Sequence, residues 1–370
     1  MLAAIERATL GDDVFLDDKD TTDLEAFIAE LTGFPAALLV VSGTMGNQLS
    51  MRTHLGGPPH SIVADARSHI IGWWVLSSSL SPENESSSQP SCPFPHSPPT
   101  LPFKLTSPPG HREAGFLASL SGALAIPITP SNVHHLTLSD IKSHTITSTD
   151  IHACPTTLIS LENTLNGSIL PLSSCRAIAA WAHSQSPPIA MHLDGARLWE
   201  AVSAGAGSLM EYCACFDSVS LCFSKGLGAP IGSMIVGSQA FIGRARHIRK
   251  GLGGGMRQAG VVSAPARVAV EETFLGGKLD GARVRAREIA RRWEERGGRL
   301  QHPVETNMVW LDLEAAGVDV GMFVERGVEK GLKVIGGRLV VHYREYLLSA
   351  SSNTNFQKPP FHLIITQPPP

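Results

Sequence analysis

Residues 189–197 read Ile-Ala-Met-His-Leu-Asp-Gly-Ala-Arg, and residues 218–228 read Ser-Val-Ser-Leu-Cys-Phe-Ser-Lys-Gly-Leu-Gly. In each segment, an apolar run typical of a buried strand leads to a charged side chain, Asp194 or Lys225, which glycine follows. A charge at the end of a buried strand is costly unless it has a partner or a function. Because open α/β sheets bind ligands at the carboxyl ends of their strands, both segments predict a ligand site at one sheet edge.

The segments around these two predict the rest of the sheet. Further short apolar runs typical of strands cover residues 36–41, 61–64, 123–128, 158–161 and 233–236. Helical patterns fill most of the gaps, notably at 173–184 and 257–274, and a helix is expected to start at Gly43. Thr22-Asp-Leu-Glu25 predicts a capping box that opens an earlier helix ending near Gly33. This alternation predicts an α/β fold with a mostly parallel buried sheet and helices on both faces.

The chain is long enough for a large domain and a smaller one. We expect a large domain over residues 1–275 and a small, incomplete C-terminal α/β domain over 280–348. In the latter, residues 281–296 are helix-like and residues 308–313 are strand-like. Two stretches rich in Ser and Pro, an insert at 71–110 and a tail at 349–370, offer little apolar surface for packing. We therefore predict that both are disordered.

Composition excludes several classes of protein. The net charge of −3, without any Lys/Arg-rich run, argues against binding to nucleic acid. The six cysteines include no Cys-x-x-Cys pair, and no His-Glu-x-x-His is present, so we expect buried free thiols and no metal site. The apolar run at 34–41 is shorter than the ~18 residues of a membrane span, and the first residues do not resemble a signal peptide. A soluble cytoplasmic protein is expected.

Lys225 and Asp194 together point to one kind of chemistry. A lysine amine can form a Schiff base with pyridoxal phosphate, and an aspartate can pair with the ring nitrogen so that the ring accepts electrons. Each residue alone has an ordinary alternative, because Lys225 could be a solvated loop lysine and Asp194 could cap a helix. The pair, each member at a strand end, predicts a pyridoxal-phosphate enzyme in which Lys225 carries the cofactor.

Six motifs in order resemble those of the threonine aldolase family. They are Gly11-Asp-Asp-Val-Phe, Ser42-Gly-Thr-Met-Gly-Asn-Gln48, His192-Leu-Asp-Gly-Ala-Arg197, Phe223-Ser-Lys-Gly-Leu-Gly228, Leu252-Gly-Gly-Gly-Met-Arg-Gln258 and Thr306-Asn-Met-Val-Trp-Leu-Asp312. The resemblance covers residues 5–70 and 111–343. It implies the aspartate-aminotransferase-like fold, a homodimer or homotetramer, and cleavage of L-threonine or L-allo-threonine to glycine and acetaldehyde. Such an activity would serve threonine catabolism and glycine biosynthesis.

The resemblance also assigns residues to the cofactor. Gly43 and Thr44 match the phosphate-binding loop, and a helix N-terminus offers free amides to a phosphate. His69 matches the histidine that stacks on the pyridine ring near the substrate hydroxyl, which makes it a candidate general base. Arg257 matches an arginine that reaches the phosphate of the neighbouring subunit, so that two subunits share each site. Without the resemblance, His69 would be a structural histidine and Arg257 a solvated arginine at a helix start.

The substrate contacts are likewise implied by the resemblance. Arg197 and Arg338 match arginines that hold the substrate carboxylate, a task suited to the bidentate guanidinium group. Arg197 could otherwise form a structural salt bridge, and Arg338 could be exposed. Glu162-Asn163 is expected to line the site. Leu165 stands where several relatives have a histidine that contacts the substrate side chain, which leaves the choice between threonine and allo-threonine open.

Two other functions stay open on sequence alone. One is a different pyridoxal-phosphate reaction on the same fold, by another lyase or an aminotransferase, because a fold does not fix the chemistry. The other is an inactive product of an aberrant gene model. The insert at 71–110, the tail, and the absence of the segment that precedes Gly11 in the family favour that alternative.

Overall fold

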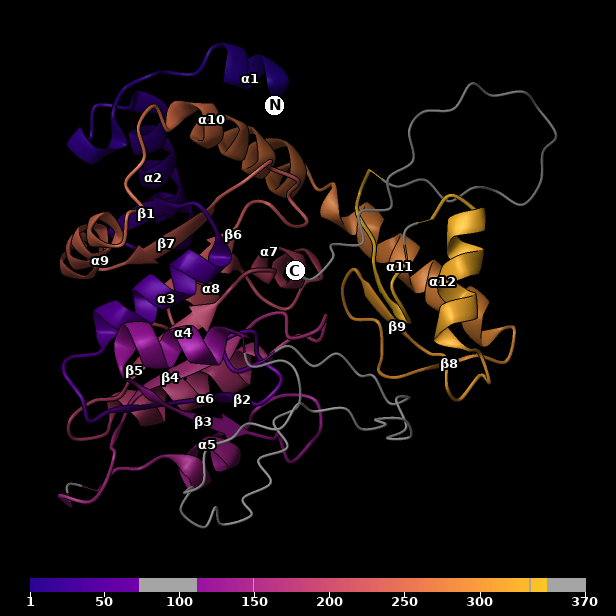
Figure 1. Ribbon diagram of the computed structural model, residues 1–370, viewed down its shortest axis with the longest axis horizontal. Helices are drawn as coiled ribbons and strands as arrows, with labels where there is room; N and C mark the ends of the chain where they lie inside the picture. The colour runs from indigo at the N-terminus through magenta and orange to yellow at the C-terminus, as the bar shows by residue number, and fades with distance from the viewer. Residues whose placement is uncertain (73–111, 149, 333, 345–370) are drawn as a thin grey trace, which may run out of the picture.

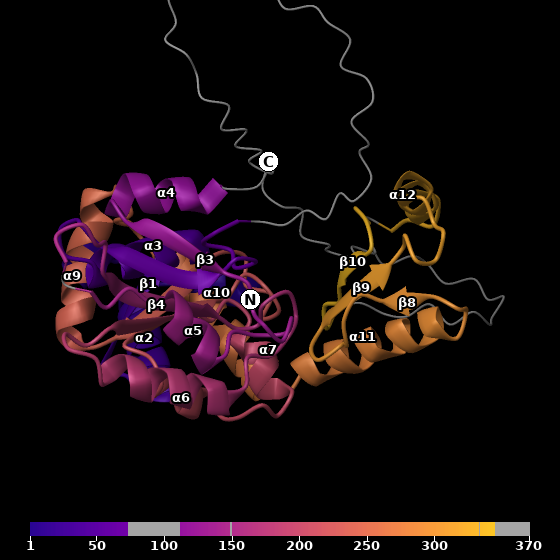
Figure 2. The same cartoon turned by 90° about the horizontal axis from the view of Figure 1, so that it is seen from below.

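The computed structural model describes residues 1–72, 112–148, 150–332 and 334–344 (Figure 1). Residues 71 and 72 continue a turn, while the rest of the predicted insert and the whole predicted tail lie outside the described residues. Two units are visible, a large one built on a seven-stranded sheet and a small one beside it (Figures 1 and 2).

The seven-stranded sheet is mostly parallel, as the sequence predicts. In spatial order its strands are β1 (Ala36–Val40), β7 (Ser233–Gly237), β6 (Ser218–Cys222), β5 (Ala190–Asp194), β4 (Thr156–Glu162), β2 (Ser61–Asp65) and β3 (Leu124–Ile128). The five strands β6, β5, β4, β2 and β3 run parallel to one another, and β7 is antiparallel to both of its neighbours, β1 and β6. Every strand predicted for the large domain is present, and the carboxyl ends of β2, β4, β5 and β6 meet at one edge.

Helices cover both faces of this sheet (Figure 2). One face carries α3 (Gly43–His54), α4 (Arg112–Ser121) and α9 (Gln239–Gly251). The other carries α2 (Lys19–Thr32), α5 (Leu138–His144), α6 (Leu172–His183), α7 (Leu198–Ser203), α8 (Leu209–Cys213) and α10 (Gly260–Ala269). A short α1 (Leu2–Glu6) packs on α10, η1 covers Asp13–Phe15, and the π-helical η2 (Val270–Leu275) continues α10. The buried apolar side chains between these layers form the core.

Three expectations about helix ends differ from the structure. The helix predicted to open at Thr22 begins at Lys19, because Asp18 accepts a hydrogen bond from the Thr21 amide and is the N-cap. The predicted capping box is therefore wrong, whereas the end at Gly33, in the left-handed conformation, is confirmed. The pattern at 257–274 becomes helical only at Gly260. Asp194 is not a helix N-cap, since α7 begins at Leu198.

The small unit contains α11 (Leu279–Glu294), β8 (Arg299–Leu300), β9 (Met308–Asp312), α12 (Val320–Glu329) and β10 (Arg338–Val340). Its antiparallel sheet has the order β10-β9-β8, and α11 packs on β9. Hydrogen bonds join it to the large unit, because the Trp310 indole and the Thr306 hydroxyl each donate over 2.8 Å to the carbonyls of Asn166 and Gly167. The turn that contains Asn166 and Gly167 thus fixes β9 against the sheet edge.

Two compositional expectations can be compared with the described residues. In this part of the chain no helix is both long enough and apolar enough to cross a membrane. Five cysteines are free; Cys175, Cys213, Cys215 and Cys222 are buried, whereas Cys154 is only half-buried. Cys92 lies outside the described residues.

Candidate active site

A cavity lies at the carboxyl edge of the large sheet, where the small unit closes over the strand ends. Its lining is mostly polar: Arg67, His69, Glu162, Asn166, Asp194, Arg197, Lys225, Met308, Trp310 and Arg338. The structure thus brings together six of the residues predicted from the sequence to lie at the site, namely His69, Glu162, Asp194, Arg197, Lys225 and Arg338. They come from four different strand ends and from the small unit, so only the folded chain assembles them.

Asp194 is the last residue of β5, and its side chain is held in one orientation. Its Oδ2 accepts a 2.6 Å hydrogen bond from the Asn47 amide nitrogen, and its Oδ1 accepts a 3.0 Å bond from the Ala196 backbone amide. Asp194 is only 4% exposed. Each oxygen of the carboxyl group thus faces a donor, which fixes the side chain at the cavity wall.

Lys225 stands three residues after β6, on a turn that packs against a buried carboxyl group. A Cβ atom added to Gly226 would overlap Oε1 of Glu200, so a larger residue next to Lys225 would have to displace the Glu200 carboxyl group. Glu200 is 4% exposed and forms no ion pair with the described residues. Burial raises the pKa of Glu200 to about 7, against the opposing effect of the Arg197 charge.

The two predicted carboxylate-binding arginines face the same cavity from different units. Arg197 follows β5, and its buried Nε has no acceptor among the described residues. It forms no ion pair there either, so the alternative of a structural salt bridge is wrong for this part of the chain. Arg338 begins β10 directly opposite Trp310, and its guanidinium lies 5.6 Å from the Trp310 ring centre. Burial, and then the Arg197 charge, lower the pKa of Arg338 to about 10, so it is not the exposed arginine of the alternative interpretation.

Glu162 connects His69 to the rest of the site. Its Oε2 accepts a 2.8 Å hydrogen bond from the backbone amide of His69, and it lies opposite Asp194 in the β4–β5 register. Burial and the neighbouring Asp194 charge raise the pKa of Glu162 to about 7. Of the pair predicted to line the site, Glu162 does so, whereas Asn163 is buried and hydrogen-bonds to the Leu170 backbone.

Besides Asn163, four residues that the sequence connects with the site do not line this cavity. Gly43 begins α3 at the same sheet edge, where an added Cβ would lie 2.7 Å from the Cys222 sulfur, and Thr44 follows it. Arg257 is exposed, pairs with Asp12 and lies over the Phe15 ring. Leu165 lines a neighbouring cavity together with His134 and His135.

Several lining residues were not found from the sequence. They are Arg67, Asn166, Met308 and Trp310, to which Glu200 and Asn47 add buried groups just behind the lining. Some signals were present, because Asn166-Gly167 is a typical turn dipeptide and Asn47 belongs to one of the six family motifs. What they contact depends on distant residues, and no local pattern shows that.

Comparison with known proteins adds to this geometry. The model of the beta-eliminating lyase family matches residues 1–74 and 110–316. The chain is 55% identical over 344 residues to aldolase vrtJ of Penicillium aethiopicum, covering 93% of the chain and 78% of that relative. It is 38% identical over 350 residues to alanine racemase TOXG of Cochliobolus carbonum, covering 93% and 79%. It is 41% identical over 354 residues to the low-specificity L-threonine aldolase of Candida albicans, covering 95% and 82%.

The solved structures support the same fold. A putative L-allo-threonine aldolase from Listeria monocytogenes superimposes with a TM-score of 0.66 at 21% sequence identity, over 92% of this chain and 88% of that one. At this identity the likeness concerns the fold alone. It agrees with the mostly parallel sheet flanked by helices that the described residues show.

Proposed function

The chain belongs to the beta-eliminating lyase family and is a lyase that uses pyridoxal phosphate, and we propose that it cleaves L-threonine or L-allo-threonine to glycine and acetaldehyde. The family, the fold and the cofactor expected from the sequence are thereby confirmed. One observation carries the proposal. The cavity brings a lysine, a hydrogen-bonded aspartate and two arginines together at one sheet edge.

The residues in the cavity fit pyridoxal phosphate bound to an amino acid. Arg197 has a buried Nε without an acceptor among the described residues, and a substrate carboxylate would supply one. Asp194 presents a carboxyl group that accepts a hydrogen bond on each oxygen and is thereby held in one orientation, which suits a partner of the ring nitrogen. When bound, the cofactor supplies an electron sink for the bonds at the substrate Cα atom.

We assign the following tasks to the side chains. Lys225 holds the cofactor through its amine, and Asp194 stabilises the proton on the ring nitrogen. Arg197 and Arg338 bind the substrate carboxylate and orient the amino acid for cleavage between Cα and Cβ. His69 removes the proton from the β-hydroxyl oxygen, directly or through water, while Glu162 fixes the His69 backbone.

A second candidate is a different reaction at the substrate Cα atom. It is favoured by the similarity of this chain to a relative named alanine racemase. Racemisation moves only the Cα proton and leaves the Cα–Cβ bond intact. Product analysis separates these candidates, since an aldolase releases glycine and acetaldehyde, a racemase gives a D-amino acid and an aminotransferase gives a keto acid.

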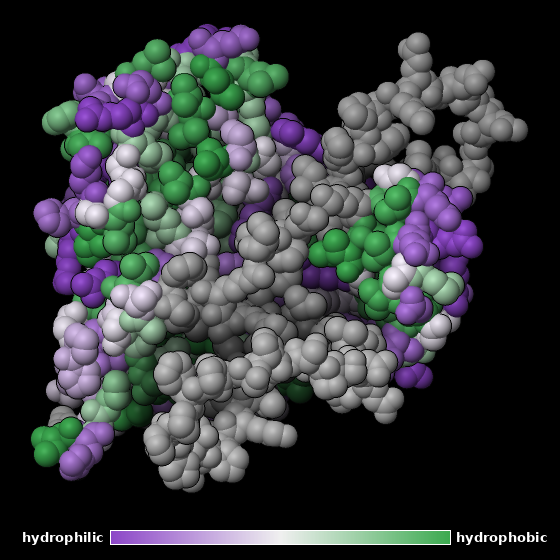
Figure 3. Space-filling view, in the orientation of Figure 1, coloured by the Kyte–Doolittle hydropathy of each residue, from purple (hydrophilic) through white to green (hydrophobic). Residues whose placement is uncertain are grey.

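We also propose that two copies of the chain share each site. Arg257 lies over the ring of the exposed Phe15, and Leu10, Leu16, Leu252 and Val261, which are near these two residues in the sequence, are exposed as well. Hydrophobic residues also occur on the face of the large unit that Figure 3 shows. An exposed apolar surface of this kind is typical of an interface between subunits. Light scattering should give at least a dimer, and Arg257→Ala should weaken cofactor binding. A monomer with full activity would contradict the shared site. The cytoplasmic location stays a prediction.

The direct test is chemical. The purified chain is loaded with pyridoxal phosphate, reduced with borohydride and mapped by mass spectrometry of its peptides, which should place the phosphopyridoxyl group on Lys225. The same preparation is assayed with L-threonine and L-allo-threonine for acetaldehyde. A label on another lysine would refute the assignment of Lys225, and a correctly labelled enzyme without acetaldehyde would refute the aldolase reaction alone.

A further inference from the structure

A continuous line of hydrogen bonds leads from the edge of the large unit to the carboxylate of Asp194. His54 Nε2 lies 2.7 Å from the Ser218 hydroxyl, which lies 2.8 Å from His192 Nδ1. His192 Nε2 lies 3.3 Å from the Asn47 side-chain oxygen, and the Asn47 nitrogen donates to Asp194 over 2.6 Å. We call His54, Ser218, His192 and Asn47 the relay.

The secondary structure places these side chains in line. Asn47 and His54 are seven residues apart on α3, which puts them on the same helix face. His192 and Asp194 are two residues apart on β5, so both point to the same face of the sheet. Ser218 is the register partner of His192 on β6. Three elements that the core fixes therefore hold the whole line.

α3 can reach the strands because a small residue faces them. A Cβ atom on Gly46 would lie 2.5 Å from the Ser220 hydroxyl of β6, so a larger residue would push the helix away. Behind this contact His192 and Ser218 are completely buried, and Asn47 is 1% exposed. Polar groups buried to this degree need hydrogen-bond partners. Within the line, Ser218, His192 and Asn47 each have two such partners, and His54, at the outer end, has one.

The chemistry of the groups fixes the direction of every hydrogen bond. A carboxylate only accepts, so the Asn47 nitrogen faces Asp194 and its oxygen faces His192. That oxygen also only accepts, so His192 carries its proton on Nε2. Burial, and then the nearby His54, lower the pKa of His192 to about 3, which leaves Nδ1 unprotonated. Ser218 must then donate to Nδ1 and accept from His54 Nε2.

We propose that the relay holds Asp194 in one orientation with its negative charge intact, and that its four members are positioning residues of the active site. All four hydrogen bonds point their donors toward Asp194, so the dipoles add in the sense that favours a carboxylate. This inference rests on the proposed role of Asp194 at the cofactor ring. It adds that this role depends on residues as far as His54, which do not line the cavity.

The first test needs no cofactor. Nitrogen-15 NMR of the cofactor-free protein, labelled on histidine and assigned with the His192→Gln variant, should show His192 as the neutral Nε2–H tautomer. Its two nitrogen shifts should stay constant between about pH 5 and pH 8, where an ordinary histidine titrates. The Nδ1–H tautomer, or a protonated ring in this range, would overturn the relay.

The second test uses two variants that remove a hydrogen bond of the relay and one variant that restores it. Asn47→Leu and His192→Leu should bind pyridoxal phosphate about 10- to 100-fold more weakly and alter the absorption spectrum of the bound cofactor, because a carboxylate loses a buried donor or its support. His192→Gln offers a nitrogen donor at the position of Nε2 and should recover much of both properties. His60→Gln and Ser50→Ala change buried polar groups outside the relay and should leave both unchanged.

The outcomes separate the inference from the proposed function. Parental affinity and spectrum in Asn47→Leu and His192→Leu, with both lost in Asp194→Asn, would overturn the relay and keep the role of Asp194. A parental spectrum and affinity in Asp194→Asn would overturn the role of Asp194 at the ring, and with it the relay as a positioning device. The NMR tautomer would still decide whether the donors of the hydrogen bonds point toward Asp194.

Discussion

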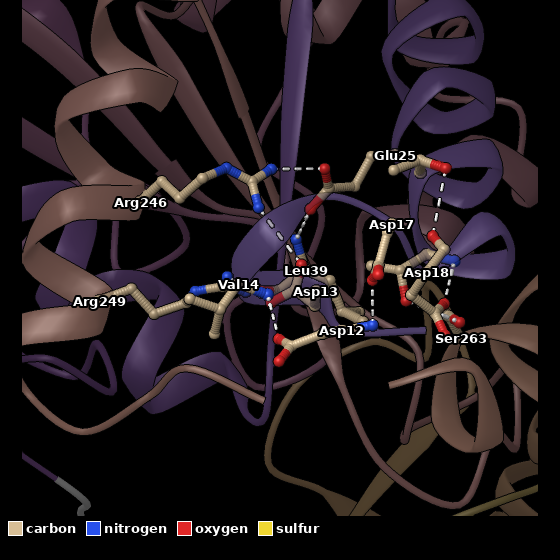
Figure 4. A network of polar contacts seen from close by, with 12 residues as sticks. Asp12, Asp13, Val14, Asp17, Asp18, Glu25, Leu39, Arg246, Arg249 and Ser263 are labelled. Atoms are coloured by element: carbon tan, nitrogen blue, oxygen red, sulfur yellow. Dashed lines mark hydrogen bonds and ion pairs between the residues drawn. The ribbon is translucent and has the colours of Figure 1, made fainter. Parts of the chain in front are cut away.

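Charged side chains are buried in two regions of the large unit, and the two regions treat them differently. Beneath the N-terminal segment, Asp13 pairs with Arg249 and Arg246, and Arg246 pairs with Glu25 over 2.5 Å (Figure 4). The Leu39 backbone completes the network by donating to Glu25 over 2.9 Å and accepting from Arg249 over 2.6 Å. This N-terminal ionic network satisfies its carboxylates inside the protein.

At the cavity two charged side chains lack such partners among the described residues. In the described part of the chain neither Glu200 nor Arg197 forms an ion pair, whereas Arg249 of the network pairs with Asp13 although its own Nε also lacks an acceptor there. A buried charge without a partner is costly, so a fold retains it where a ligand completes it. Burial alone therefore does not identify a charged side chain as functional. The absence of an ion-pair partner within the protein does identify it. We therefore expect substitutions in the two regions to have different effects.

The largest effect should follow from removing Lys225. We expect Lys225→Ala to lower the rate of acetaldehyde release at least about 1,000-fold, because the cofactor loses its covalent attachment. The melting temperature of the cofactor-free protein should stay near that of the parent, since no ion pair among the described residues is lost. A steady-state assay and a thermal unfolding curve measure the two quantities, and substantial residual activity would contradict the assignment.

The N-terminal ionic network should show the opposite pattern. Asp13→Asn leaves the buried Arg249 without its carboxylate and removes one of the two carboxylate partners of the half-buried Arg246, and we expect a loss of about 3–5 kcal/mol in the free energy of unfolding. Asp23→Asn is the matched control, because Asp23 pairs with Lys19 on the surface and such pairs contribute only about 0–1 kcal/mol. Urea denaturation of the cofactor-free proteins measures both. Equal losses would show that burial of the network adds nothing.

The contrast between these regions could be predicted from the sequence only in part. The seven strands were predictable because each is a short apolar run, and Asp194 and Lys225 stood out as charges at strand ends. Which charged or polar side chains bind to each other was not predictable. Asn47 and Asp194 are 147 residues apart, and Arg249 and Asp13 are 236 apart, so only packing shows which charge is satisfied. The error at Thr22 has the same origin, because Asp18 also binds the distant Gly260 amide.

A smaller effect is expected at the substrate arginines. Arg338→Lys keeps the positive charge but loses the planar fork that binds a carboxylate with two hydrogen bonds. We expect KM for L-threonine to rise about tenfold with little change in cofactor affinity, since Arg338 faces the substrate end of the cavity in our proposal. Arg344→Lys, on the exposed end of the small unit, is the control. A change in cofactor affinity without a change in KM would place Arg338 on the cofactor.

The effect expected at Glu200 depends on pH. The pKa of Glu200 is raised to about 7 in the folded protein, from 4.5, because burial penalises its charged form. The folded state therefore binds this proton more tightly than the unfolded chain, so the contribution of Glu200 to stability is complete below pH 4.5. It is lost as the pH rises toward 7 and beyond.

The glutamine side chain of Glu200→Gln has no proton to lose in this pH range. Relative to the parent, the cofactor-free variant should gain about 1–3 kcal/mol of unfolding free energy between pH 5 and pH 8. Taking the difference at each pH cancels other groups, including Glu162, which both proteins share. Urea denaturation across this range measures the difference. A constant difference would mean that Glu200 keeps its charge in the folded state and has found a partner, which would place it with the N-terminal ionic network instead of the cavity.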